Sequence, residues 1–323
     1  MRWSFSPVLC NSKSKSVSLK FFSIICLAMV LSPFSFINSS IAEEDILNGH
    51  GLFWKLEREG REPSYILGTM HVADKRVLKI KDEVEPYLIK ASVLYLEIDL
   101  TQREMREAYN ARLRDDGRTL DEVLPTEIYE KIREISKAHK VEERHLKQLE
   151  LWAVYPIVKS MPSDPGQEDL DSFEIPLDFQ LGQLAKENSV EVKGLETVRE
   201  QLAVFRERKR KIYYDAIVRA LKNPDAVENS LEKMEQYIQW YTERDTNAFY
   251  NSLLEDLKDE PPEMYDIWVR RLLNKRNLNM ANGMARGLVR GNSFTAVGAL
   301  HLPGEKGLLK ILADRGYTIT RLD

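Results

Sequence analysis

Four short segments rich in β-branched and aromatic residues limit the fold more than any other feature of the sequence. They cover residues 64–68, 92–98, 189–194 and 293–298, and weaker segments at 52–58 and 317–322 are candidates for a fifth and a sixth strand. Such segments favour β-strands, and nearly everything between them has the spacing of helices. The sequence therefore predicts an α/β fold of mixed α+β character, with a small central mixed sheet surrounded by many helices.

Helices are predicted wherever aliphatic and aromatic residues recur every three or four positions. The predicted helical segments are 81–90, 103–113, 125–140, 177–188, 196–221, 226–242 and 262–288. Pro125 is expected at the first helical position of its segment, where a missing N–H costs nothing. No Gly-, Ser- or Pro-rich linker divides the chain after residue 42, so we expect one domain over residues 43–323.

The first 42 residues have the order of a secretory signal peptide. Basic residues up to Lys20 are followed by an apolar stretch at 21–37, and Ser40 and Ala42 supply a small-x-small cleavage pattern. We therefore expect export to the periplasm, cleavage near Ala42 and no integral membrane segment in the mature chain. A retained anchor is the alternative, although serines and Pro33 interrupt the apolar stretch.

The cysteine content and the charge of the mature chain restrict its chemistry and its partners. Cys10 and Cys26 both lie within the first 42 residues, so the mature chain must be held together by its core without disulfides. Without the four cations of that segment, its formal charge is about −8. This charge argues against nucleic acid or an anionic membrane as a partner. The basic run at 206–211 is expected to be a solvated helix face.

Each of the four strongest strand segments ends at, or within a few residues of, a side chain that can act in catalysis or bind a metal ion. The first and the last end in Gly-x-x-His, which supplies His71 and His301, and the other two end at Glu97 and Glu196. In open α/β sheets, sites gather beyond the carboxyl ends of the strands. We therefore expect these four side chains to converge, although they lie far apart in the sequence.

Two imidazoles with one or two carboxylates suit Zn, Mn, Co or Fe. The glycines of the two motifs, Gly68 and Gly298, are expected to let the backbone turn tightly and approach a ligand. Each piece also has a structural alternative, since a histidine after a strand is often a hydrogen-bonded loop residue. Glu196 and Asp178 can equally be acids in the first turn of a helix. Three further histidines are expected at the surface: His50, His139 and His145.

Several motifs in this order resemble the TraB/GumN family. They are YILGTMHV at 65–72, LYLEID at 94–99, LDFQLGQLAKENSVEVKGLET at 177–197, Arg276-Asn277, and VGALHLPGEKGLLKILADRGYTI at 297–319. The resemblance covers most of the mature chain, and the last block is its most specific part.

The resemblance implies a domain related to the Tiki metalloproteases and, more distantly, to erythromycin esterases and haem-binding ChaN-like proteins. It nominates His71, Glu97 and His301 as the metal-binding or catalytic core. Four more residues match family positions with less defined roles: Asp178, Glu196, Arg276 and Asn277. Arg276 is expected to pair with a carboxylate or a substrate oxyanion, or else to form a purely structural ion pair.

The leading functional expectation is an exported, metal-dependent hydrolase that cleaves a peptide or protein. A divalent Mn, Co or Zn ion would activate water, with Glu196 as general base or as an orienting residue. The sequence has no HExxH motif and hence no ordinary zinc-protease layout. The alternatives are a haem- or metal-binding protein, a non-catalytic protein that sequesters a peptide, and a degenerate site.

Overall fold

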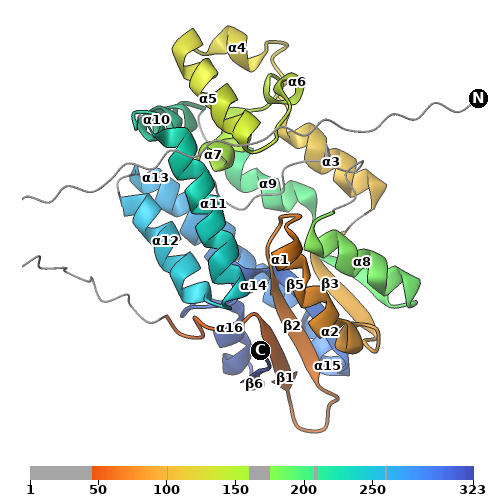
Figure 1. The fold of residues 1–323 in the computed structure, drawn as a ribbon. Coiled ribbons are helices and arrows are strands. Elements are labelled where there is room, and N and C mark those ends of the chain that lie inside the picture. Colours follow the sequence, from red (N-terminus) through yellow and green to blue (C-terminus); the bar gives the residue numbers. More distant parts are fainter. Residues whose placement is uncertain (1–45, 100, 160–174, 207–209, 224, 259) are drawn as a thin grey trace, which may run out of the picture. The chain divides into compact units, whose positions relative to one another are not determined.

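The computed structural model describes residues 46–99, 101–159, 175–206, 210–223, 225–258 and 260–323, all within the unit Ala42–Asp323 (Figure 1). The expected signal peptide and part of the basic run at 206–211 lie outside these residues. Among the residues described, no helix is both long and apolar enough to cross a membrane.

A six-stranded sheet has the order β4-β3-β5-β2-β1-β6 (Figure 1). The strands are β1 (Phe53–Glu57), β2 (Ser64–Thr69), β3 (Val93–Ile98), β4 (Glu191–Glu196), β5 (Ser293–Gly298) and β6 (Thr318–Arg321). β4, β3, β5 and β2 are parallel neighbours, whereas β1 runs antiparallel to β2 and β6. The predicted α/β fold with a mixed sheet is therefore confirmed, including both weaker strands.

Helices surround this sheet and supply most of the remaining structure. They are α1 (Lys75–Leu78), α2 (Ile80–Leu88), α3 (Gln102–Arg112), α4 (Leu120–Val123), α5 (Thr126–Ala138), α6 (Glu143–Leu146), α7 (Leu151–Val158), α8 (Leu177–Glu187), α9 (Val198–Arg206), α10 (Arg210–Ala220), α11 (Ala226–Thr242), α12 (Thr246–Lys258), α13 (Pro262–Tyr265), the π-helix η2 (Asp266–Lys275), α14 (Arg276–Gly283), α15 (Ala285–Arg290), the 3₁₀-helix η3 (Ala299–His301) and α16 (Leu308–Asp314).

Two of the longest predicted helical segments depart from the prediction over the residues that the structure describes. The segment 196–221 begins with the last residue of β4 and then contains α9 and α10, while 262–288 contains α13, η2, α14 and α15. Pro125 is the N-cap of α5 rather than its first residue. The spacing of apolar residues by three and four predicts an α-helix, so the rare π-helix η2 was not predicted.

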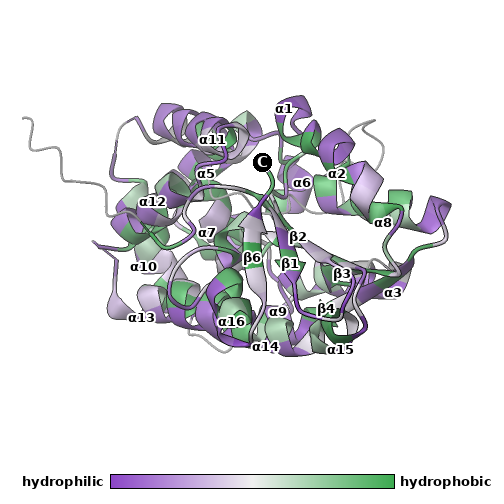
Figure 2. Cartoon of the chain, turned by 90° about the horizontal axis from the view of Figure 1, so that it is seen from below, coloured by the Kyte–Doolittle hydropathy of each residue, from purple (hydrophilic) through white to green (hydrophobic). Residues whose placement is uncertain are grey.

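Alternating side chains of the central strands pack against different helices. Leu94 and Leu96 of β3 share an apolar cluster with α2 and α8, whereas Val93 and Tyr95 share one with α14 and α15. Figure 2 shows these two groups of helices on opposite sides of the sheet. A strand that is buried on both faces must be apolar throughout, which explains the near-continuous apolar sequence of β3.

A third apolar cluster joins α5, α7, α9, α10, α12 and η2. Two partly buried residues from the carboxyl ends of the central strands, Ile98 in β3 and Leu300 in η3, pack against this cluster. The helical cluster therefore adjoins the edge of the sheet at which the sequence predicts a site.

Candidate functional site

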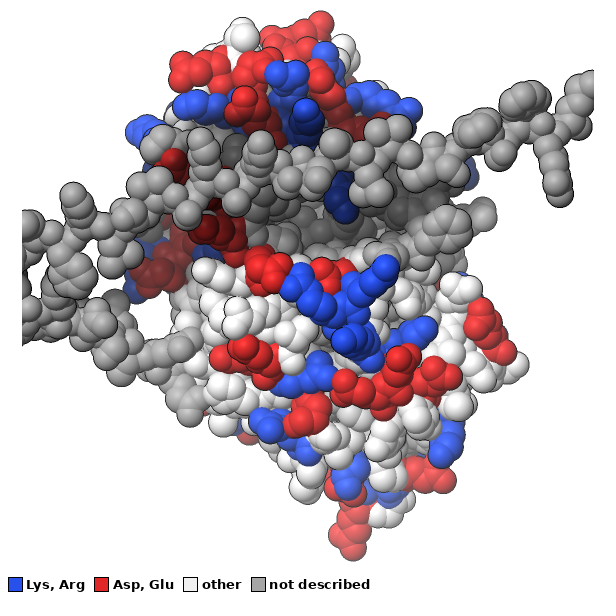
Figure 3. Space-filling model, in the orientation of Figure 1, with Lys and Arg blue, Asp and Glu red and all other residues white. Residues whose placement is uncertain are grey.

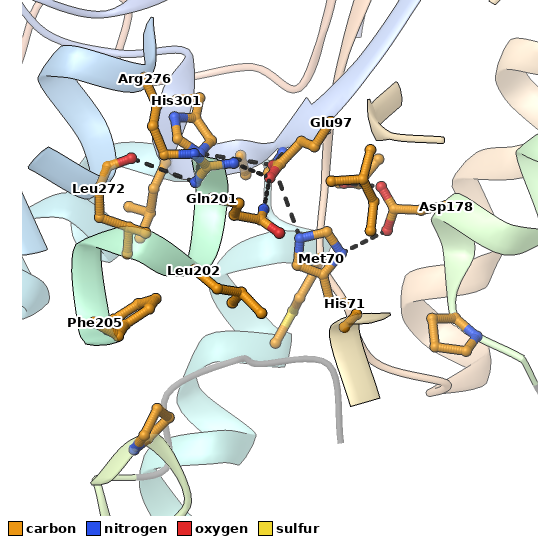
Figure 4. A pocket seen from close by; sticks show the side chains of 18 of the residues that line it. Met70, His71, Glu97, Asp178, Gln201, Leu202, Phe205, Leu272, Arg276 and His301 are labelled. Atoms are coloured by element: carbon orange, nitrogen blue, oxygen red, sulfur yellow. Dashed lines mark hydrogen bonds and ion pairs between the residues drawn. The ribbon is translucent and has the colours of Figure 1, made fainter. Parts of the chain in front are cut away.

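The four parallel strands bring the nominated residues to one edge of the sheet. His71 follows β2, Glu97 lies near the end of β3, Glu196 ends β4 and His301 lies in η3 directly after β5. His71, Glu97 and His301, together with Arg276 at the start of α14, line one cavity (Figure 4). The expected convergence of residues from distant parts of the chain is thus present in the structure.

Gly68 and Gly298 are needed for close packing rather than for a turn. Neither glycine has a positive φ, so the expectation of a tight, glycine-specific turn is wrong. A Cβ on Gly68 would lie 3.0 Å from the Cα of Ala299, and a Cβ on Gly298 would lie 3.1 Å from Oε1 of Glu97 and 3.8 Å from Nε2 of His71. The bare glycine at 298 therefore keeps open the space where the site residues meet.

Glu97 is the buried centre of the site. Its Oε2 accepts hydrogen bonds from Nη2 of Arg276 at 2.5 Å and from Nε2 of Gln201 at 2.9 Å, and its Oε1 accepts one from the backbone N–H of Gly298 at 2.7 Å. Burial alone raises the pKa of Glu97, but the positive charge of Arg276 opposes burial, and that pKa lies well below its usual range. Glu97 is therefore an ionised acceptor.

Both imidazoles present Nε2 to the same oxygen of Glu97. The distance to Oε1 is 3.9 Å from Nε2 of His71 and 3.6 Å from Nε2 of His301. His71 remains partly exposed, with 32% of its side chain accessible, whereas His301 is buried. Two ring nitrogens and one carboxylate oxygen thus face one another where the cavity begins.

The outer nitrogen of each ring is held by a hydrogen bond. Nδ1 of His71 lies 2.7 Å from Oδ2 of Asp178, whose Oδ1 accepts from the hydroxyl of Thr69 at 2.7 Å. Nδ1 of His301 lies 2.6 Å from Oδ1 of Asn277. Because a carboxylate and an amide oxygen accept, each Nδ1 carries a proton. Nε2 of His301 keeps its lone pair, because Nη1 of Arg276 lies 3.2 Å from it. Asp178 lies in the first turn of α8, yet its contact with His71 goes beyond a helix-end role.

His301 is a neutral imidazole in this environment. Burial lowers its pKa to about 3, an effect that Glu97 opposes and Arg276 reinforces. The amide of Asn277 is fixed as well, since its Nδ2 donates to the backbone carbonyl of Lys306 at 2.8 Å. The tautomer of His301 therefore follows from the protein structure around it.

Arg276 connects the two carboxylates and one imidazole. Its Nε donates to Oε2 of Glu196 at 2.7 Å, and its Nη1 lies 3.2 Å from Nε2 of His301. Burial raises the pKa of Glu196, and Arg276 opposes this rise. Glu196 ends β4 rather than starting a helix, and it is not among the residues that line the cavity. It is thus placed to balance the charge of Arg276 from behind.

The donor types of His71, His301 and Glu97 suit a divalent ion, and the two imidazole-to-carboxylate distances are somewhat longer than those between bound ligands. Four tetrahedral ligands with bonds of about 2.1 Å lie about 3.4 Å apart, close to the two imidazole-to-carboxylate distances of 3.6 and 3.9 Å. Hydrogen-bonded outer ring nitrogens are typical of metal-binding histidines. Within the described ranges, no group of three or more His, Cys, Asp or Glu side chains is close enough together to hold a metal ion as it stands. His71, Glu97 and His301 are the residues that would hold such an ion, and Nη1 of Arg276 contacts Nε2 of His301.

The cavity shows two features that the sequence did not predict. Gln201, which donates a hydrogen bond to Glu97, directly precedes Leu202 in an apolar stripe formed by Val198, Leu202 and Phe205 in α9. A polar residue within such a stripe was the available signal. His145 also lines the cavity, is buried and stacks on Tyr109 with ring centroids 5.3 Å apart, so its predicted surface position is wrong.

The fold and site define an α/β protein with a two-histidine, one-carboxylate centre at the carboxyl edge of a parallel sheet. The chain belongs to the TraB/PrgY/gumN family, whose family model matches residues 52–321. A comparison with curated proteins found no significant match.

Replacing Arg276 with methionine should destabilise the fold strongly. The substitution leaves the buried Glu97 and Glu196 without a counter-charge, which costs about 3–5 kcal/mol for a broken buried pair. Urea unfolding should show this loss, and adding Glu196→Gln to Arg276→Met should recover part of it. A single variant within about 1 kcal/mol of wild type would contradict a central electrostatic role for Arg276.

Acid should destabilise the metal-free protein through His301. Its pKa of about 3 in the folded chain lies below the ordinary value of about 6.5, so between those values the unfolded chain binds a proton that the folded chain does not. The free energy of unfolding should therefore fall as pH drops from about 6.5 to about 4.5, by up to about 1.4 kcal/mol per pH unit. His301→Gln should show a shallower dependence in urea titrations. Identical slopes would refute this assignment.

Proposed function

We propose that this protein is an exported, metal-dependent hydrolase that cleaves a peptide or protein amide. The observation that supports it most is the meeting of Nε2 of His71, Nε2 of His301 and Oε1 of Glu97, with both outer ring nitrogens already held. Export rests on the sequence pattern of the first 42 residues, and N-terminal sequencing of the protein recovered from the periplasm tests it, with a start directly after Ala42 expected.

His71, His301 and Glu97 would hold a Mn, Co or Zn ion. Such an ion supplies Lewis-acid polarisation of a carbonyl and lowers the pKa of a bound water. Asp178 keeps the ring of His71 oriented, while Asn277 does the same for His301. Outer partners of this kind raise ligand basicity and fix the tautomer.

Arg276 would act on both the protein and the substrate. It keeps Glu97 ionised, and it lines the cavity with a positive charge that favours an oxyanion developing on the scissile carbonyl. Glu196 bonds Arg276 and is not among the residues that line the cavity, so we assign it the orienting role rather than that of general base. Gln201 holds the second oxygen of Glu97 and so directs Oε1 toward the histidines.

A second candidate is hydrolysis without a metal, in which His71 is the general base. The contact of 2.7 Å between His71 and Asp178 favours it, because a carboxylate on Nδ1 orients the ring and stabilises the imidazolium. The contact between Nη1 of Arg276 and Nε2 of His301 also favours it, since Arg276 already uses that lone pair. Activity that survives complete metal removal would select this candidate.

The metal proposal predicts a defined pattern among single variants of the full chain. His71→Ala and His301→Ala should each lose bound Mn, Co or Zn and peptide cleavage, because each removes one of three protein ligands. Asp178→Asn should weaken metal affinity by about 10–100-fold, because it removes the acceptor that orients His71. Metal content is measured by inductively coupled plasma mass spectrometry. Cleavage is measured with a mixed peptide library.

His50→Ala is the matched control, because His50 is exposed and pairs with Asp245 away from the cavity. It should keep the metal content and the cleavage of wild type. Unchanged metal and cleavage in both His71→Ala and His301→Ala would exclude a catalytic metal at this site. A stable complex with intact peptide that chelators do not affect would instead indicate a sequestering protein, and a Soret band that His71→Ala abolishes would indicate a haem protein.

A further inference from the structure

The cavity that contains the site has a volume of about 280 Å³, and we call the part of it that is lined by apolar side chains the chamber. Its apolar lining includes Trp152 of α7, Leu202 and Phe205 of α9, Leu253 of α12 and Trp268 of η2. Figure 4 shows Leu202, Phe205 and Met70 on one side of the polar group that contains Glu97 and the histidines. A substrate bond at the polar end would thus have an apolar space directly beside it.

The walls of this chamber are preformed. The rings of Trp152 and Phe205 stack with centroids 5.2 Å apart at an interplanar angle of 8°, and Phe205 meets Trp268 edge to face at 5.5 Å. All three side chains belong to the buried helical cluster, which fixes their positions. A ligand therefore loses little affinity to the ordering of the protein.

The size of the chamber selects one large group. An apolar cavity of about 150 Å³ holds a benzene molecule, so the whole cavity of about 280 Å³ accommodates an indole ring or a long aliphatic side chain beside the polar centre. A small group would leave part of the apolar wall uncovered, and a polar group would lose its hydrogen bonds to water.

The surface charge does not favour a ligand of one sign. On the face shown in Figure 3, Lys and Arg side chains lie among Asp and Glu side chains.

We infer that this chamber binds the large aromatic or aliphatic side chain of the substrate residue that adjoins the scissile bond. The assignment of that bond rests on the proposed hydrolase function, whereas binding of the apolar side chain does not. The residues of the polar centre and those of the chamber line the same cavity. A group bound in the chamber is therefore part of the same molecule as the bond at the polar centre.

The test compares two small probes that differ only in the side chain. N-acetyl-L-tryptophanamide should bind the full chain at least about tenfold more tightly than N-acetyl-L-glutaminamide in ligand-observed NMR titrations. Ala153→Trp, which adds a ring to the lining of the chamber at α7, should weaken tryptophanamide binding about tenfold. Ala313→Trp, on the exposed side of α16, is the matched control and should bind as wild type does. Equal affinity for the two probes, or unchanged binding by a folded Ala153→Trp protein, would overturn the inference.

A second measurement covers the case in which Ala153→Trp does not fold. The N-acetyl amide of a diazirine-bearing leucine analogue is photolysed with wild-type protein, and the labelled peptides are mapped by mass spectrometry. Label on α7, α9, α12 or η2 supports the inference, whereas label confined to other segments contradicts it. Tight binding of tryptophanamide without any peptide cleavage would contradict the proposed hydrolase function but not this inference. Cleavage without preference for large apolar residues would contradict this inference but not the hydrolase function.

Discussion

The arrangement of the site depends on the buried guanidinium of Arg276. It bonds Glu97 of β3 and Glu196 of β4 and reaches His301 after β5, so one side chain at the start of α14 joins three strand ends. A buried arginine is tolerated only with well-placed counter-charges, and here two carboxylates supply them. The same charge keeps Glu97 ionised and able to face two imidazoles.

The geometry around Arg276 follows from the parallel sheet and from glycine. Parallel neighbours bring the ends of β2, β3, β4 and β5 to one edge, and Gly68 lets β2 approach η3 until a Cβ would clash. Asp178 and Asn277 then fix the two rings from outside the centre. Packing and hydrogen bonds thus hold the polar centre in place before any ligand binds. The apolar chamber beside it is preformed in the same way.

The sequence predicts the sheet and the convergence of the nominated residues well, because both depend on local patterns. The strand segments carry their own composition, and two Gly-x-x-His motifs at strand ends can only meet at one edge of a parallel sheet. The sequence does not predict how helices dock, which depends on contacts between distant segments. The burial of His145, the contact of Gln201 with Glu97 and the chamber wall at Trp268 all arise from such docking. The reason for Gly298 was also missed, because crowding by neighbouring side chains leaves no trace in the sequence.

We propose that His71, His301 and Glu97 hold one divalent ion. X-ray absorption spectroscopy of the cobalt-loaded full chain tests it most directly, because imidazole rings give distinct outer-shell scattering. We expect two imidazoles and an oxygen donor at about 2.0–2.2 Å, with one imidazole lost in His301→Ala. A spectrum with only oxygen ligands, unchanged by His71→Ala and His301→Ala, would contradict it.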